Sequence, residues 1–115
     1  MSHVYKVLSH ADWEAAQARG VFEGAEIDLR DGYIHLSTAA QAPETLRLHF
    51  RGRDDLVILQ LDSLQLGEAL RWEEARGGQS FPHLYGPLDP AKVLKVELLP
   101  LDADGVPAPA APLSA

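Results

Sequence analysis

The residues of this chain best suited to chemistry gather in the hexapeptide Phe81-Pro82-His83-Leu84-Tyr85-Gly86. It places the imidazole of His83 two residues from the phenol of Tyr85, and its proline and glycine keep the segment out of a helix. An imidazole is the commonest side chain for proton transfer near neutral pH. We expect a fixed loop in which His83 and Tyr85 face a ligand. The alternative is that Phe81, Leu84 and Tyr85 plug one end of the core.

A second motif of the same kind, Asp31-Gly32-Tyr33-Ile34-His35-Leu36-Ser37, lies upstream and alternates like a strand. Its two aliphatic residues point one way, while Tyr33, His35 and Ser37 share the other, polar face. On that face His35 can hydrogen-bond a hydroxyl or phosphate of a ligand. The alternative is a partly buried histidine whose ring bonds a backbone carbonyl.

Charged residues beside a glycine pair form a third group. Arg71 and Glu73 flank a tryptophan and so share a face, and Arg76 directly precedes Gly77-Gly78. The functional interpretation is a cleft lined by these side chains, in which the glycine amides approach an anion. The alternative is an exposed Arg–Glu pair that contributes less than about 1 kcal/mol.

Other chemistries have weaker support. His35, His83 and Glu73 could form a two-histidine, one-carboxylate metal set, but no compact ligand spacing is present, so we expect no metal site. The chain has no cysteine, which excludes zinc–thiolate sites and cysteine nucleophiles. It also has no Gly-x-Ser-x-Gly elbow of a serine hydrolase. His49 falls on the apolar side of its predicted helix and is expected in the core.

The composition fits a small globular protein with a small-molecule partner. The 115 residues suffice for one domain, and the formal charge is −7, from 17 acidic and 10 basic residues. Duplex nucleic acid is not an expected partner, because binding it requires a dense basic footprint. No apolar run approaches the roughly 20 residues of a membrane span, and no signal-peptide core is seen, so a cytoplasmic location is expected. The sequence leaves the oligomeric state open.

Strand and helix patterns place both histidine motifs in one domain, residues 1–101. The predicted strands are 3–8, 33–37, 55–62, 69–73 (with Trp72 inward) and 92–99, and the two predicted helices are 10–19 and 38–50. Regular βαβ alternation stops after the second helix, which favours an α+β fold with a mixed or mostly antiparallel sheet. From Asp102 the composition shifts to Ala, Pro and Gly, which predicts a disordered tail over 102–115.

These motifs resemble those of a bacterial family known as domain of unknown function 952. The resemblance runs from Val4 to about Leu99. It is carried by the two histidine motifs, by Tyr5-Lys6 with Trp13, by Gln41, by Leu70-Arg71-Trp72-Glu73 and by Arg76-Gly77-Gly78. The match of both histidine motifs at this separation is highly specific. The family has no settled activity, so the resemblance indicates a fold more firmly than a function.

That family is in turn similar to the ADP-ribosyltransferase-like superfamily, which holds NAD in a cleft of a split, mostly antiparallel sheet. RNA 2′-phosphotransferases carry a similar histidine strand. The likeness implies that His35 contacts the nucleotide and that Tyr85 stacks on a flat ring. It implies that Glu73 or Glu97 stands for the superfamily's late glutamate. Lys6 stands where the superfamily commonly has a histidine or arginine on its first strand.

We therefore expect a cleft that binds a nucleotide-like or phosphorylated ligand, of the NAD or ADP-ribose type; no cofactor is identified with certainty. An enzyme of this kind would be an ADP-ribosyl- or phosphotransferase. Its catalytic residues would be His35, His83 and Glu73, and its binding residues Tyr33, Ser37, Arg71, Arg76, Gly77, Gly78 and Tyr85. The alternatives are a non-enzymatic module that binds a metabolite or peptide, and a purely structural protein. A functional site requires both histidine rings to line one cavity.

Overall fold

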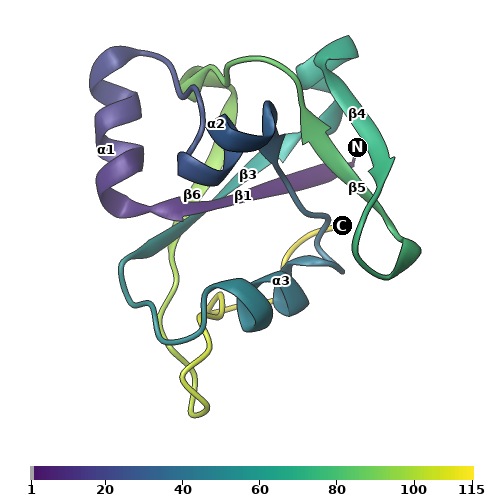
Figure 1. The fold of residues 1–115 in the computed structure, drawn as a ribbon. Helices are drawn as coiled ribbons and strands as arrows, with labels where there is room; N and C mark the ends of the chain where they lie inside the picture. The colour runs from purple at the N-terminus through teal and green to yellow at the C-terminus, as the bar shows by residue number, and fades with distance from the viewer. Residues whose placement is uncertain (1) are drawn as a thin grey trace.

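The computed structural model describes residues 2–115, whose strands form two three-stranded antiparallel sheets (Figure 1). The strands are β1 (His3–Ser9), β2 (Ile34–His35), β3 (Leu56–Asp62), β4 (Leu70–Glu74), β5 (Ser80–Leu84) and β6 (Val93–Leu98). The α-helices are α1 (His10–Arg19), α2 (Glu26–Asp31) and α3 (Ala42–His49), and short 3-10 helices cover Ser63–Ala69, Arg76–Gly78 and Pro90–Lys92. The predicted α+β class with a mostly antiparallel arrangement is confirmed.

The two sheets meet at a single bridge. The first sheet has the order β1-β3-β6 and the second the order β2-β5-β4. Tyr5 in β1 and Ser37, just after β2, exchange two backbone hydrogen bonds of 2.8 and 2.9 Å. In Figure 1, α1 and α2 lie over one side of the first sheet and α3 lies on its other side. The second sheet therefore continues the first across a split, and both histidine motifs lie beyond that split.

Helix α1 forms where the sequence signals predict it. The Ser9 hydroxyl accepts a hydrogen bond of 3.0 Å from the Asp12 backbone N–H, which is the N-cap contact. Gly20 ends the helix in the left-handed conformation, at φ 79°, and donates to Ala16. Trp13 and Ala16 are buried, as their spacing indicated. Local capping thus fixes both ends of α1.

Strand β3 is almost continuously apolar because it contributes to two separate cores. Val57 and Leu59 join the larger hydrophobic cluster, with Trp13 of α1. Ile58 points to the opposite face and joins the smaller cluster, with Leu46 of α3. Alternate side chains of one strand thus hold α1 and α3 on opposite faces of the sheet. The predicted central strand, buried on both faces, is confirmed.

The hexapeptide with His83 is a strand, not the loop that we expected. Residues Ser80–Leu84 form β5, the central strand of the second sheet. Pro82 is tolerated because it faces Trp72 on β4, while on its other side its carbonyl accepts from the Leu36 N–H at 3.1 Å. Proline has no N–H to return to Leu36, so the ladder with β2 stops at His35. This explains why β2 is shorter than the predicted strand 33–37.

A third helix, α2, was not predicted. It is six residues long, which is too short for a periodic pattern, and its N-terminus lacks the serine or threonine cap used elsewhere. Instead the Asp28 carboxylate turns back to accept from the Ala25 backbone N–H at 2.8 Å. Gly24 is required beside it, because a Cβ there would lie 2.9 Å from the Asp28 Cβ. A buried aspartate therefore organises α2.

The orientation predicted for Trp72 was wrong. Its side chain is 48% exposed, whereas Leu70 on the same strand packs against the larger core. β4 is the edge strand of the second sheet, and in Figure 1 none of the three labelled helices lies against it. The alternation of the strand was read correctly, but burial depends on what covers it.

The segment 102–115, for which composition predicted a disordered tail, follows a defined path in the structure. Val106 and Leu113 pack against the smaller core, and Leu101 bridges Pro107. The Tyr5 hydroxyl donates to the Ser114 carbonyl at 2.5 Å. Isolated apolar residues between prolines are a weak signal in the sequence, which is why these contacts were not expected.

No helix among residues 2–115 has the length and apolar character to cross a membrane.

Deleting residues 102–115 is expected to lower the free energy of unfolding by about 2 kcal/mol, because Val106 and Leu113 would leave hydrocarbon. Urea unfolding of both forms, followed by tryptophan fluorescence, measures this. Equal unfolding midpoints would mean that the segment is an unattached tail.

Candidate functional site

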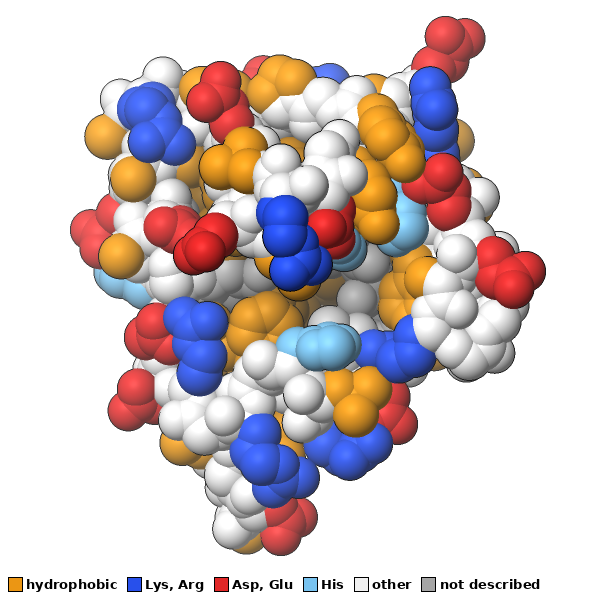
Figure 2. All heavy atoms as spheres, viewed as in Figure 1, with side chains coloured by type: hydrophobic (Ala, Val, Ile, Leu, Met, Phe, Trp, Pro, Cys, Tyr) orange, Lys and Arg blue, Asp and Glu red, His pale blue; other side chains and the backbone are white. Residues whose placement is uncertain are grey.

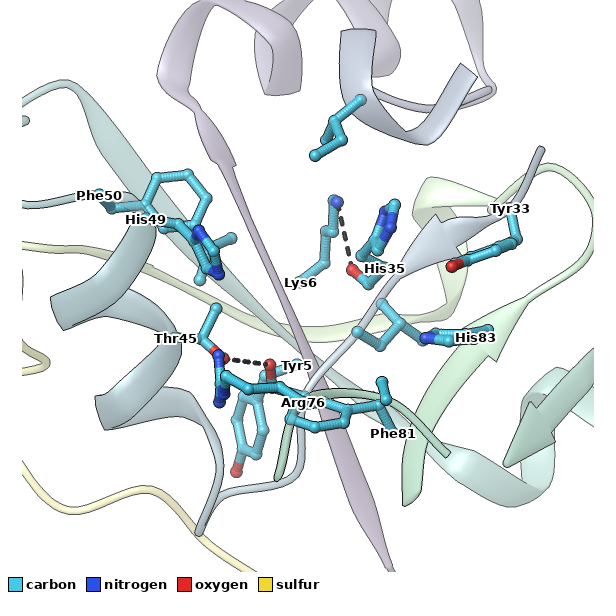
Figure 3. Close-up of a pocket in the computed structure, with 15 residues that line it drawn as sticks. Tyr5, Lys6, Tyr33, His35, Thr45, His49, Phe50, Arg76, Phe81 and His83 are labelled. Atoms are coloured by element: carbon cyan, nitrogen blue, oxygen red, sulfur yellow. Dashed lines mark hydrogen bonds between the residues drawn. The ribbon is translucent and has the colours of Figure 1, made fainter. Parts of the chain in front are cut away.

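A cavity of about 500 Å³ opens where the two sheets split. Its lining residues come from β1, α2, the Tyr33–Ser37 segment, α3, the loop before β5 and β5 itself: Tyr5, Lys6, Val7, Ile27, Tyr33, His35, Leu36, Ser37, Thr45, His49, Phe50, Ala75, Arg76, Phe81 and His83. Figure 2 shows the hollow in the middle of the molecular surface, with histidine side chains beside it. Figure 3 shows His49 and Phe50 across the cavity from His35 and His83. The volume lies in the range of small-molecule sites.

The two histidine motifs meet in this cavity. His35 and His83 are direct partners in the antiparallel pairing of β2 with β5, and their ring centroids are 5.8 Å apart. The Tyr33 ring stacks on the His83 ring at 4.1 Å, with 21° between the planes. The sequence criterion, that both histidine rings line one cavity, is met.

A buried ion pair holds His35 in place. The Lys6 ammonium lies 2.8 Å from one oxygen of Asp28, and both side chains are almost fully buried. The other Asp28 oxygen accepts from the His35 backbone N–H at 3.0 Å and contacts His35 Nδ1 at 2.6 Å. Lys6 also donates to the His35 carbonyl at 3.2 Å, which Figure 3 marks with a dashed line. One carboxylate thus ties β1, α2 and β2 together.

Burial and pairing shift the pKa values in this network. Burial lowers the pKa of Lys6, and the charge of Asp28 opposes that shift only in part. Burial alone would raise the pKa of Asp28, but the hydrogen bond from His35 and the charge of Lys6 hold it far below its ordinary value. On the far side of the ring, His35 Nε2 lies 2.9 Å from the Asp31 carboxylate. Both ring nitrogens of His35 thus lie within hydrogen-bond distance of a carboxylate.

His83 has a carboxylate partner of its own. Its Nδ1 lies 2.8 Å from Glu73 Oε1, and the Tyr85 hydroxyl donates to the same oxygen at 2.7 Å. These hydrogen bonds from His83 and Tyr85 lower the pKa of Glu73, and the bond to Glu73 raises the pKa of Tyr85. Glu73 therefore fixes the His83 ring with its Nε2 turned away from the carboxylate.

Arg76 reaches the cavity from the turn before β5. Its guanidinium lies over the Phe81 ring, 4.9 Å from the centroid, and donates to the Thr45 hydroxyl at 3.4 Å. None of the ion pairs formed by residues 2–115 includes Arg76. Its charge is available to an anion. Arg71 instead lies over the Tyr85 ring, 4.7 Å from the centroid, outside the cavity lining.

The structure divides the predicted site residues into three groups, the third being Gly77 and Gly78. Tyr33, His35, Ser37, Arg76 and His83 line the cavity. Glu73, Tyr85 and Arg71 form the layer behind His83, on the same face of β4 and β5.

Gly77 and Gly78 do not line the cavity. Both have the positive φ that favours glycine, and the Gly78 N–H already donates to the Ala75 carbonyl at 3.1 Å. Glu97 lies on β6, paired with Lys95, away from the cavity. The glycines therefore shape the turn that carries Arg76, and of the two glutamates only Glu73 touches the site.

Sequence reasoning missed four residues of the site: Lys6, Asp28, Thr45 and His49. His49 was assigned to the core, but it is exposed and lines the cavity one turn from Thr45. The i, i+4 spacing of these two polar residues was the available signal. Asp28 had none, because its charged partner, Lys6, lies 22 residues away in the sequence. Among residues 2–115 no group of three or more potential ligands has the arrangement of a metal site.

Residues 7–96 match the model of a family described as protein of unknown function, DUF952. The crystal structure of protein CC0527 from Caulobacter crescentus superposes with a TM-score of 0.91 at 52% identity, covering 93% of this chain and 94% of that one. The solution structure of CC0527 gives 0.85 at 53% identity, with coverages of 93% and 92%. A search of the curated proteins finds no match.

Replacing Asp28 by Asn is expected to lower the free energy of unfolding at pH 7 by about 3 kcal/mol, since it leaves the Lys6 ammonium buried without a counter-charge. The folded pKa of Asp28 is depressed, so its ionised form stabilises the protein above its ordinary pKa of 3.8, and this contribution declines as the pH falls below 3.8. The variant should lose that part of the acid dependence. Urea unfolding at a series of pH values between 2.5 and 7, in steps of about 0.5 pH unit, measures both the loss of stability and its pH dependence.

The matched control is Asp54→Asn, which removes an exposed carboxylate. It should leave both the stability and its pH dependence within about 0.5 kcal/mol of the parent. If Asp28→Asn behaves like this control, the Lys6–Asp28 pair does not organise the site.

Proposed function

The chain belongs to the DUF952 family, and we propose that it binds a phosphorylated, nucleotide-like ligand in the cavity between its two sheets. The observation that carries the proposal is the charge of the lining. It contains two cationic side chains and three histidines but no aspartate or glutamate, in a chain that carries 17 acidic against 10 basic residues. A cavity of this sign in an acidic protein favours an anion.

Arg76 is the residue proposed to hold the phosphate. Lys6 also reaches the lining, but Asp28 balances its charge at 2.8 Å. Within residues 2–115 the Arg76 guanidinium makes one hydrogen bond, to the Thr45 hydroxyl, and lies over the Phe81 ring, so its other N–H groups can form charge-assisted bonds. In Figure 3 its guanidinium lies beside Thr45, across the cavity from Lys6 and His35.

The aromatic walls support a flat ring as the second part of the ligand. Phe81 and Phe50 line the cavity, and Tyr33 contributes a ring already stacked on His83. Aromatic side chains stack on any nucleobase, and each such contact is typically worth about 1–3 kcal/mol. Phe81 lies under the Arg76 guanidinium, whereas Phe50 and Tyr33 line other parts of the wall, so a cation and separate aromatic faces are available to the phosphate and the base of a nucleotide.

The ADP-ribosyltransferase-like resemblance makes NAD or ADP-ribose the first ligand to test. Two sheets joined at one bridge, with His35 beside the split, agree with the split sheet that the resemblance implies. In the enzymatic form of the proposal, His83 Nε2 contacts a ribose hydroxyl and Glu73 acts by orienting His83, since it does not line the cavity.

Isothermal titration of the purified chain with ADP-ribose and with NAD tests the binding. We expect Arg76→Gln to weaken binding by about 2 kcal/mol, or roughly thirtyfold, because it removes a charged hydrogen bond to phosphate. The matched control is Arg19→Gln, which makes the same change in the exposed last turn of α1. No heat with any nucleotide at high protein concentration, or equal losses in both variants, would contradict the proposal.

Glu73→Gln separates an enzyme from a binding module. The non-enzymatic binding module is the second candidate function. It is favoured by the position of Glu73, which is bonded to His83 and Tyr85 and does not line the cavity. If the chain is a transferase or glycohydrolase, the variant should lose about a hundredfold in kcat for NAD with little change in KM. A chain that binds ADP-ribose but consumes no NAD in either form is the non-enzymatic module.

A further inference from the structure

Strand β6 leaves one edge of the first sheet open. The opposite edge strand, β1, is bridged by Ser37, whereas β6 pairs with no strand other than β3 among residues 2–115. Three of its side chains are large, apolar and exposed: Leu94 at 53%, Val96 at 42% and Leu98 at 70%. Exposed edges with apolar side chains pair readily with a further strand.

The backbone of β6 is oriented for such pairing. The Leu99 N–H donates to the Leu56 carbonyl, and the ladder with β3 is regular from Lys95 to Leu98. Because the groups of an antiparallel strand alternate, those of Val96 and Leu98 face away from β3. Among residues 2–115 no loop or turn supplies a backbone hydrogen bond to either of them.

We propose that β6 pairs with β6 of a second copy of this chain, antiparallel and centred on Val96. The sequence Leu94-Lys95-Val96-Glu97-Leu98 has the same pattern of apolar and charged residues in both directions, with the two charges exchanged. Two-fold pairing therefore places Lys95 opposite the partner's Glu97 in the regular part of the strand, and it brings Leu94, which lies at a bulge in the ladder with β3, near the partner's Leu98. Each copy contributes both charges, so two cross-strand ion pairs form.

The charges also specify the register. A shift by one residue sets Lys95 and Glu97 against apolar partners. A shift by two sets lysine against lysine or glutamate against glutamate, which is unfavourable. Only the centred register joins opposite charges and apolar side chains together.

A second copy fits this edge better than an unrelated partner does. The contact uses the same patch on both chains, so the assembly closes as a two-fold dimer with one continuous six-stranded sheet. Both β6 edges are paired in the dimer, so no further strand can add to them. Lys95 and Glu97 are already paired within the strand at 3.0 Å and need only small movements to reach across.

Sedimentation equilibrium of the full chain over a wide concentration range tests the proposal. We expect a species of twice the 12.5 kDa chain mass. Lys95→Glu should raise the dimer dissociation constant by about tenfold or more, because it sets two glutamates against two glutamates. The double variant Lys95→Glu with Glu97→Lys should restore the parent value, since the exchanged charges still pair.

A second pair of variants tests the apolar part of the interface. Val96→Lys places two lysines at the two-fold axis and should abolish the dimer. Leu64→Lys makes the same kind of change at an exposed leucine, 77% accessible and outside β6, and should not. Far-UV circular dichroism confirms that each variant is folded.

A chain that is monomeric at every concentration overturns the proposal. So does a dimer that Lys95→Glu leaves unchanged or that the double variant fails to restore. The test of the dimer is independent of the ligand proposal, because β6 does not line the cavity. Nucleotide titration of each variant then shows separately whether ligand binding is kept.

Discussion

The buried ion pair between Lys6 and Asp28 is the interaction on which the rest of the structure depends. Removing two charges from water is costly, and the cost is offset only where hydrogen bonds satisfy both groups. Here the carboxylate accepts from Lys6, from the Ala25 N–H, and from the backbone and ring of His35. Together with Asp28 itself, these residues belong to β1, to the start of α2 and to β2. Helix α2 has few other anchors, so this single carboxylate positions it against both sheets.

The same device recurs at the second histidine in a more exposed form. Glu73 accepts from His83 Nδ1 and from Tyr85, as Asp28 does from His35 Nδ1 and Lys6. Each ring is therefore oriented by a carboxylate that lies outside the cavity lining. The acidic residues of the site contact the histidines from behind, and the wall itself consists of cations, hydroxyls, histidines, aromatic rings and aliphatic side chains. This separation gives the cavity a charge opposite to that of the chain as a whole.

What the sequence predicted well was set by near neighbours. The Ser9 and Gly20 caps, the apolar run of β3 and the polar face of Tyr33, His35 and Ser37 depend on residues within one turn or one strand. What it missed depends on contacts between distant segments. His35 and His83 could be matched as motifs, but their direct pairing follows from the register of β2 with β5. The same register is needed to predict that β5 is a strand and that Pro82 shortens β2. It is also needed to predict that Asp28 contacts His35.

The bridge between Tyr5 and Ser37 has a mechanical consequence. Each sheet is braced by its own ladders, whereas only this bridge joins the main chains of β1 and the β2 segment; the other links across the split are side-chain contacts, from Lys6 and from the larger core. Fewer main-chain hydrogen bonds cross the split than hold either ladder, so opening along it should cost less than opening a ladder. Both bridging residues also belong to the wall of the cavity. A ligand that contacts both of these residues would therefore brace the two sheets against each other.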